Sequence, residues 1–222
     1  MKSIKNIVRM VMMHIAGFLN YWTRGKLKPA HVTTLSLVGH IPVAWALVSC
    51  RPVLAAALLA FFSLLDALDG ALARVQGSAT RGGMFFDAVS DRLKEVIVYS
   101  ALAVFMHKHL DPADAWLVVA VAGTSLLVSY TKAKGEMAVA SEKTDMQKLN
   151  RAFGIGFASY EIRVVAIVIG LLLGWITYIL PLLLAANMLT IALRFVVISR
   201  ELYLLDQKEG AVKKKAVKND KN

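Results

Sequence analysis

The sequence predicts an all-α membrane protein with six transmembrane helices and an N-terminal amphipathic helix on the membrane surface. Of its 222 residues, 57% are hydrophobic, and the mean hydropathy is +0.57. This composition is far more apolar than that of a soluble domain. Six apolar segments also reach the length of about 20 residues that a spanning helix needs.

The expected spans pair into three hairpins. Pro52, the pair Asp111-Pro112 and Pro181 are expected to mark tight connections, because proline lacks the amide donor that a continuing helix needs. All six spans belong to one predicted domain over residues 29–206. The spans are expected at residues 32–50, 53–73, 84–106, 113–133, 157–177 and 180–203.

The distribution of basic residues predicts the orientation. Among the 26 Lys and Arg residues, only Arg51 and Lys108 fall in the first and third connections, and none falls in the fifth. The positive-inside rule therefore places the opposite side in the cytoplasm. We expect a multi-pass protein of the cell membrane with both termini and the active site on the cytoplasmic side.

Both ends of the sequence are basic. Residues 1–28 mix Lys2, Lys5 and Arg9 with apolar residues, which predicts an amphipathic juxtamembrane segment. Residues 207–222 are predicted to form a disordered basic tail attracted to anionic lipid. No nucleic-acid partner is expected despite the net charge of +11, because the aromatic residues lie in apolar runs rather than among the basic ones.

Two pairs of aspartates stand at the expected cytoplasmic ends of the second and third spans. Asp66 and Asp69 are three residues apart and Asp87 and Asp91 four apart, so each pair shares a helix face. Charged side chains at membrane depth are costly and therefore indicate function. Converging carboxylates need cations to offset their repulsion, and oxygen ligands suit Mg²⁺ or Mn²⁺. Two such ions could stabilise both oxygens of a phosphoryl displacement.

Two other interpretations of the acids are less consistent with the sequence. Internal salt bridges could pair the four carboxylates, but the nearby Arg and Lys residues do not outnumber them enough to pair each one. A cation transporter should carry polar residues into the outer halves of its spans. The second and third spans are almost wholly apolar there, beyond Ser63 and Ser100.

Residues 66–91 resemble the signature of the CDP-alcohol phosphatidyltransferases, D-x-x-D-G-x-x-A-R, eight residues, G-x-x-x-D-x-x-x-D. A preceding stretch, with Pro29 and Thr33 in place and Ala30 where asparagine is common, resembles the family's P-N-x-x-T entry to the first span. The fixed positions of the signature are Asp66, Asp69, Gly70, Ala73, Arg74, Gly83, Asp87 and Asp91.

The resemblance implies a chemistry for these positions. The four aspartates would hold two divalent ions, Mg²⁺ or Mn²⁺, and Asp91 would also take the proton of the acceptor hydroxyl. That hydroxyl would attack the β-phosphorus of a CDP-activated lipid, either CDP-diacylglycerol or an archaeol analogue, and expel CMP. A homodimer in the lipid bilayer is implied as well. The residues implied to contact the CDP-lipid are Thr33, Gly70, Ala73, Arg74 and Gly83.

The acceptor is expected to be a small phosphorylated alcohol, because several cations can face one interior cavity. The pattern S-Y-x-K-A-K-x-E at 129–136, with Thr190 and Arg194, resembles prokaryotic members that make phosphatidylinositol phosphate or its archaeal ether counterpart. Tyr160 stands near where that subgroup has a further arginine. Glycerol 3-phosphate, giving phosphatidylglycerol phosphate, is the alternative acceptor. The residues implied to hold the phosphate of inositol phosphate are Ser129, Lys132, Arg163 and Arg194.

Overall fold

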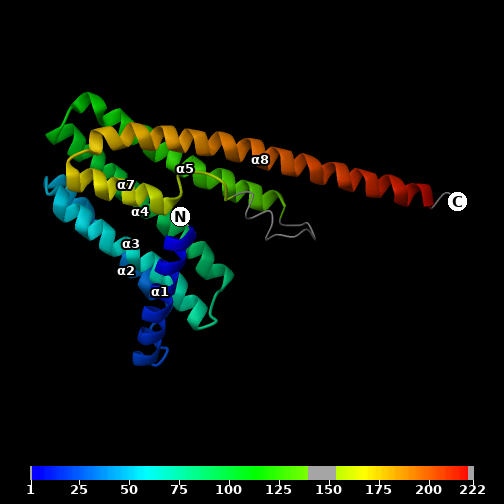
Figure 1. The fold of residues 1–222 in the computed structure, drawn as a ribbon, viewed down its shortest axis with the longest axis horizontal. Helices are drawn as coiled ribbons and strands as arrows, with labels where there is room; N and C mark the ends of the chain where they lie inside the picture. Colours follow the sequence, from blue (N-terminus) through cyan, green and yellow to red (C-terminus); the bar gives the residue numbers. More distant parts are fainter. Residues whose placement is uncertain (1, 140–153, 220–222) are drawn as a thin grey trace. The chain divides into compact units, whose positions relative to one another are not determined.

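The computed structural model describes residues 2–139 and 154–219. Within these ranges all regular structure is helical, as predicted, and no strand is present. The helices are α1 (Lys2–Trp22), α2 (Pro29–Val48), α3 (Pro52–Val75), α4 (Arg81–His109), the 3-10 helix η1 (Pro112–Asp114), α5 (Ala115–Ala138), α7 (Tyr160–Leu173) and α8 (Ile176–Asn219) (Figure 1).

Four helical segments among the described residues are long and apolar enough to cross a membrane. They are Pro29–Val48, Pro52–Val75, Pro112–Ala138 and Ile176–Gln207. The other two expected spans coincide with α4, which carries charged side chains in its N-terminal half, and with α7, which has 14 residues. Six apolar segments are therefore helical as expected, whereas the number of spans stays a prediction.

Proline and glycine set several of the helix boundaries. Pro29 and Pro52 begin α2 and α3, where the missing amide hydrogen would have no partner in the helix. The expectation that Pro181 marks a connection is wrong, because this residue lies inside α8. The chain turns instead at Gly174, whose φ of 70° is a left-handed conformation that glycine adopts without steric cost.

The backbone of α8 is helical as far as Asn219, so it extends into residues 207–222, where a disordered tail was predicted. Charge composition was the basis of that prediction. Lys, Ala, Glu and Gln, which make up most of this stretch, also have favourable helix propensities.

The chain forms two compact units. The first comprises Met1–Ala122 and Arg163–Pro181, and the second comprises Gly123–Ile162 and Leu182–Asn222. In the first unit α2 packs against both α3 and α4. The contact of α2 with α3 is close: a Cβ at Gly39 would lie 2.1 Å from Cδ1 of Phe62. The Ser36 hydroxyl also donates a 2.9 Å hydrogen bond to the Phe62 carbonyl.

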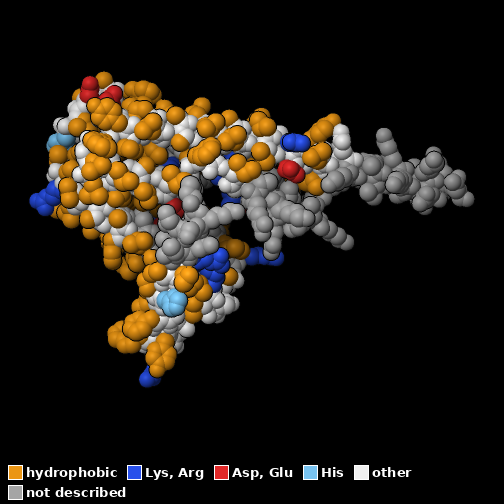
Figure 2. Space-filling view, viewed as in Figure 1, with side chains coloured by type: hydrophobic (Ala, Val, Ile, Leu, Met, Phe, Trp, Pro, Cys, Tyr) orange, Lys and Arg blue, Asp and Glu red, His pale blue; other side chains and the backbone are white. Residues whose placement is uncertain are grey.

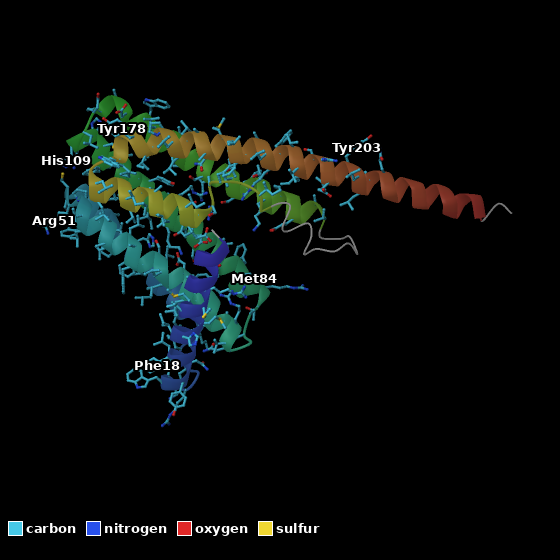
Figure 3. The ribbon with its side chains drawn as sticks, viewed as in Figure 1. Phe18, Arg51, Met84, His109, Tyr178 and Tyr203 are labelled. Carbon is cyan, nitrogen blue, oxygen red and sulfur yellow. The ribbon has the colours of Figure 1, made fainter. Side chains whose placement is uncertain are left out.

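Helix α1 has two apolar faces. One face packs on α3, where Ala16 joins a buried core that includes Leu68 and Leu72. The amide of Gln76 fixes this end of α1 by donating a 2.9 Å hydrogen bond to Oδ1 of Asn20. The other face is exposed, and Phe18 projects from it (Figure 3). The large apolar side chains of this exposed face are Met10, Val11, Ile15, Phe18, Tyr21 and Trp22.

Apolar side chains also cover much of the visible surface of the described helices (Figure 2). Phe61, Trp116, Val119, Leu182 and Phe195 are all more than half exposed. A soluble monomer rarely exposes so much continuous apolar surface, whereas helices that face lipid do so as a rule. The surface therefore fits a membrane protein.

Candidate active site

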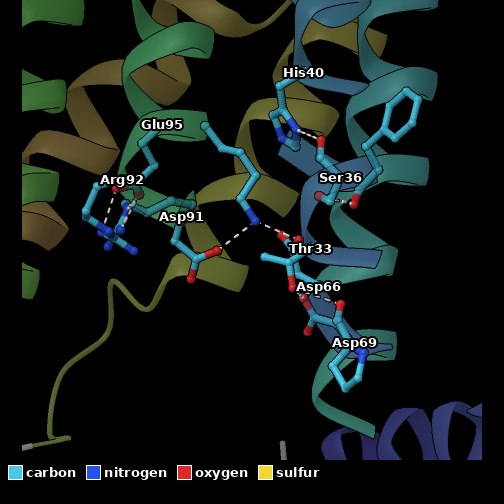
Figure 4. Close-up of polar contacts among 12 residues, drawn as sticks. Thr33, Ser36, His40, Asp66, Asp69, Asp91, Arg92 and Glu95 are labelled. Atoms are coloured by element: carbon cyan, nitrogen blue, oxygen red, sulfur yellow. Dashed lines mark hydrogen bonds and ion pairs between the residues drawn. The ribbon is translucent and has the colours of Figure 1, made fainter. Parts of the chain in front are cut away.

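The two aspartate pairs lie in the first unit, on the C-terminal half of α3 and the N-terminal half of α4. Asp69 is the most buried of them, with 5% of its surface exposed. Its Oδ2 atom accepts a 2.5 Å hydrogen bond from the Thr33 hydroxyl of α2 (Figure 4). Since α2 packs against both helices, it holds the two pairs in one region of the unit.

A lysine joins the two helices at the aspartates. The Nζ atom of Lys94 lies 2.6 Å from Oδ1 of Asp66 in α3 and 2.7 Å from Oδ1 of Asp91 in α4 (Figure 4). The Lys94 side chain is fully buried, whereas those of Asp66 and Asp91 are 12% and 21% exposed. One buried ammonium group thus serves two of the acids predicted to bind metal.

A cavity of about 450 Å³ opens beside the other two acids, Asp69 and Asp87, which both line it. Thr80, also on its wall, accepts a 3.0 Å hydrogen bond from the backbone amide of Gly83 and so caps the N-terminus of α4. The five residues expected to contact the CDP-lipid all belong to the lining: Thr33, Gly70, Ala73, Arg74 and Gly83.

The donor atoms around this cavity fit a hard divalent cation in kind, because carboxylate oxygens are the ligands that Mg²⁺ and Mn²⁺ prefer. Asp69 also lies within electrostatic range of Asp66 and Asp87. Across the described ranges, however, no three acidic, histidine or cysteine side chains are grouped closely enough to form a ready metal site. Lys94 is the side chain that stands between Asp66 and Asp91.

A second buried ion cluster lies further along α4. Glu95, which is 6% exposed, accepts hydrogen bonds from Nε of Arg163 at 3.1 Å and from its Nη2 atom. Glu95 also pairs with Nη1 of Arg92 at 2.6 Å. Arg163, a residue expected to bind the acceptor phosphate, is thus held by a carboxylate of its own unit.

Three other residues of the expected acceptor site belong to the second unit. The Ser129 hydroxyl donates a 3.4 Å hydrogen bond to the Ser125 carbonyl, and Lys132 pairs with Glu136 at 3.6 Å. Arg194 is almost fully buried. Its Nε donates a 2.9 Å hydrogen bond to the Ile155 carbonyl, and its Nη1 donates to the Val128 carbonyl.

Thr190 holds the segment before α7 together with Arg194. Its hydroxyl oxygen accepts hydrogen bonds from the backbone amides of Phe157 at 3.1 Å and Ala158 at 3.2 Å. The hydroxyl also donates to the Ala186 carbonyl at 2.7 Å. The T-x-x-x-R pair of α8 therefore binds backbone groups of residues 155–158 within the second unit.

The sequence-based reasoning missed Lys94, Glu95, Arg92 and the buried His40, whose Nδ1 lies 2.8 Å from the Ser36 carbonyl oxygen. A signal was present, since three more charged residues in an apolar helix directly after Asp91 indicate function as strongly as the aspartates do. The count of Arg and Lys residues against acids also assumed one cation for each acid. In the structure one lysine pairs with two acids.

Comparison with known families identifies the chain. The sequence profile of the CDP-alcohol phosphatidyltransferases matches residues 26–198. The chain belongs to this family. It is therefore an enzyme of the CDP-alcohol phosphatidyltransferase class, and the family membership expected from the signature at 66–91 is confirmed.

Several relatives of this CDP-alcohol phosphatidyltransferase are named as phosphatidylinositol phosphate synthases or as bifunctional IPC transferases and DIPP synthases. The phosphatidylinositol phosphate synthase of Mycobacterium tuberculosis is 36% identical over 114 residues, which cover 50% of this chain and 52% of that protein. The bifunctional IPC transferase and DIPP synthase of Rubrobacter xylanophilus is 33% identical over 148 residues, covering 67% and 32%. The protein of the same name from Aquifex aeolicus is 30% identical over 212 residues, covering 94% and 45%. The chain thus spans about half or less of the length of these relatives.

Solved structures of the Mycobacterium tuberculosis phosphatidylinositol phosphate synthase share the fold. The structure with CDP-DAG bound superposes with a TM-score of 0.71 at 26% identity, covering 85% of this chain and 94% of that one. The structure in complex with manganese and citrate gives a TM-score of 0.70 at 26% identity, covering 84% and 88%. A member of the family close in fold therefore binds both a CDP-lipid and a divalent metal ion.

Proposed function

We propose that this CDP-alcohol phosphatidyltransferase transfers a phosphatidyl-type group from a CDP-activated lipid to inositol phosphate and releases CMP. The observation that carries the proposal is the cavity at the α3 and α4 aspartates. Its lining contains each residue expected to contact the CDP-lipid, as well as Asp69 and Asp87. Several relatives are named as phosphatidylinositol phosphate or archaetidylinositol phosphate synthases, which supports the choice of acceptor.

The donor nucleotide is proposed to occupy the cavity. Gly70 and Ala73 lack bulk on the wall of α3, so phosphate and sugar groups can approach the helix closely. Arg74 is exposed there and offers a planar, permanently charged fork to the diphosphate. The Thr33 hydroxyl fixes one oxygen of Asp69 and so sets the direction in which its other oxygen faces.

Asp66, Asp69, Asp87 and Asp91 are proposed to hold two divalent ions, Mg²⁺ or Mn²⁺. Such ions would neutralise the diphosphate and stabilise the departing CMP. The support for this assignment is the oxygen-only donor set and the manganese complex of a relative with the same fold.

Asp91 is proposed as the base. A hydroxyl oxygen of the acceptor attacks the β-phosphorus of the CDP-lipid and forms a new P–O bond, while its proton passes to the Asp91 carboxylate. The bond from the β-phosphorus to the oxygen bridging to CMP breaks, and CMP leaves with that electron pair. The Lys94 ammonium, 2.7 Å from Oδ1 of Asp91, orients the carboxylate for this step.

Ser129, Lys132, Arg163 and Arg194 are proposed to bind the acceptor phosphate. Their support is the concentration of cations in apolar helices, where an anionic ligand offsets the cost of desolvation. Glycerol 3-phosphate, the alternative acceptor, carries the same phosphate and differs in its polyol. The choice between the two therefore depends on groups that recognise the inositol ring.

The membrane arrangement is proposed to have six spans, with α1 on the cytoplasmic surface beside the active site. The exposed apolar face of α1 suits the acyl boundary, and its basic residues suit anionic head groups. This placement lets the acyl chains of the donor stay in the bilayer while its nucleotide enters the cavity. Both termini would then be cytoplasmic, and the resemblance to the family favours a homodimer.

The test is CMP release by the purified chain in lipid nanodiscs. CDP-diacylglycerol is supplied with inositol phosphate, glycerol 3-phosphate or unphosphorylated inositol, each with Mg²⁺, with Mn²⁺ or with EDTA. We expect turnover with inositol phosphate and a divalent ion, and none in EDTA. Faster turnover with glycerol 3-phosphate would establish the alternative acceptor, and equal turnover with free inositol would refute the phosphate pocket.

A further inference from the structure

Lys94 is a buried cation whose part in the proposed chemistry extends only to the orientation of Asp91. Its Nζ lies 2.6 Å from Asp66 and 2.7 Å from Asp91, and its side chain is fully buried. The contact with Asp66 is a charge-assisted hydrogen bond, and the contact with Asp91 is an ion pair of nearly the same length. The two carboxylates come from different helices, so a single ammonium group ties α3 to α4 at the site.

Burial makes these contacts strong. Water does not reach Lys94, and its two partners are only 12% and 21% exposed, so solvent screens the charges weakly. A buried lysine without anionic partners would be unstable, and two facing carboxylates without a cation would repel each other. Lys94 therefore supplies to Asp66 and Asp91 the positive charge for which the family uses divalent ions.

A divalent ion at the same carboxylates must share them with this lysine. Each carboxylate can offer its second oxygen, but an ammonium group and a divalent ion bound to one carboxylate lie only a few ångströms apart. At that range the two cations repel each other strongly even in a partly polar medium. Asp69 and Asp87 are different, because both line the cavity beside this ion pair.

We propose that Lys94 is a resident counter-cation that competes with the divalent metal for Asp66 and Asp91. It makes the two metal positions unequal: the ion that depends on Asp66 and Asp91 binds weakly, and the ion that depends on Asp69 and Asp87 binds tightly. Lys94 is thus a positioning residue, which holds Asp91 toward Asp66 and sets the metal concentration that the enzyme needs. This inference rests on the proposed metal role of the four aspartates.

The experiment is Mn²⁺ binding to the purified chain in nanodiscs, followed by electron paramagnetic resonance of the free ion, with no substrate present. Lys94→Gln removes the charge but keeps a hydrogen-bond donor of similar length, and Lys94→Arg keeps the charge. Lys108→Gln is the matched control, because Lys108 lies near the C-terminal end of the same helix and is exposed. Unfolding of each variant in EDTA and in Mn²⁺ is measured in parallel by tryptophan fluorescence.

We expect the wild-type chain to bind Mn²⁺ in a tight and a weak step. Lys94→Gln should tighten the weak step by about tenfold or more and leave the tight step unchanged, because a cation beside the second ion is gone. Its melting temperature should fall in EDTA and recover in Mn²⁺. Lys94→Arg and Lys108→Gln should bind as the wild type does.

Equal Mn²⁺ affinity in the wild type and Lys94→Gln would overturn the competition and leave the metal assignment intact. If neither the wild type nor any variant bound Mn²⁺, both the metal role of the aspartates and the competition with Lys94 would be refuted. Should Lys94→Gln fail to fold, the comparison moves to Asp66→Asn with and without Lys94→Gln, which leaves fewer unpaired carboxylates. Tighter Mn²⁺ binding by the double variant supports the proposal, and unchanged binding refutes it.

Discussion

The Thr33 hydroxyl donates a 2.5 Å hydrogen bond to Asp69, and both residues line the cavity proposed for the CDP-lipid. The bond joins the beginning of α2 to the acidic part of α3. It also explains why a threonine matters at the entry to the first span, where the resemblance to the family rests on Pro29 and Thr33 but lacks the usual asparagine.

Replacing Thr33 by valine should therefore weaken the donor site. A hydrogen bond to a charged group contributes about 1.5–3 kcal/mol, so we expect the KM for CDP-diacylglycerol to rise by roughly tenfold or more. The matched control is Thr34→Val, because the Thr34 hydroxyl bonds only the Ala30 carbonyl of its own helix among the contacts described. If both variants raised this KM equally, the effect would come from the stability of α2 and not from the hydrogen bond to Asp69.

Replacing Asp91 by asparagine should separate binding from chemistry. The variant loses the carboxylate that takes the acceptor proton, but the walls of the donor cavity stay in place. We expect turnover to fall by at least about a hundredfold, within the range assigned to general acid–base catalysis, while CDP-lipid affinity changes little. Calorimetric titration of the CDP-lipid and single-turnover CMP release give the two quantities. A parallel fall of affinity and rate would make Asp91 mainly a metal ligand and the assignment of the base wrong.

Replacing Arg194 by alanine should raise the acceptor KM by about tenfold or more, since a charge-assisted contact with the phosphate is lost. The structure adds a second role, because Arg194 also bonds the carbonyls of Ile155 and Val128. Thr190→Val separates the two roles, since Thr190 bonds the same segment through its hydroxyl but carries no charge. If both variants raise the KM equally, Arg194 acts through the segment 155–158 and not on the phosphate.

Replacing Gly39 by alanine should disturb the packing of α2 on α3 and lower the stability of the protein. An added Cβ would lie 2.1 Å from the Phe62 ring, so Gly39→Ala requires the ring to shift and should destabilise the fold by about 1–3 kcal/mol. Gly123→Ala is the control within a helix, because nothing lies within 4 Å of a Cβ there. The control should be neutral or slightly stabilising, since alanine favours a helix over glycine. Thermal unfolding of the two variants in the same detergent measures the difference.

Apolar runs were enough to locate most of the helices, because burial of backbone amides in lipid leaves few alternatives to a helix. Helix spacing was likewise enough to place each aspartate pair on a single helix, Asp66 and Asp69 on α3 and Asp87 and Asp91 on α4. The turn at Gly174 was missed because the connection was assigned to Pro181, which lies inside α8.

The ion pairs between helices could not be predicted from the spacing of residues along the sequence. That Lys94 serves two acids, and that Arg163 meets Glu95 across 68 residues of sequence, depends on how α3, α4 and α7 pack in three dimensions. A helix pattern fixes which face a residue lies on, but not which residue of another helix it meets. The polar network of the site is therefore knowable only from the fold.

The tight turn between α2 and α3 carries a natural site for chemical labelling. Cys50 is the single cysteine of the sequence, and the left-handed backbone of the turn, with φ of 55°, leaves its thiol exposed. A membrane-impermeant maleimide applied to intact cells or to inverted vesicles would label this one atom from one side only. The sidedness of the whole enzyme can thus be measured on the unaltered sequence, with no engineered tag or cysteine.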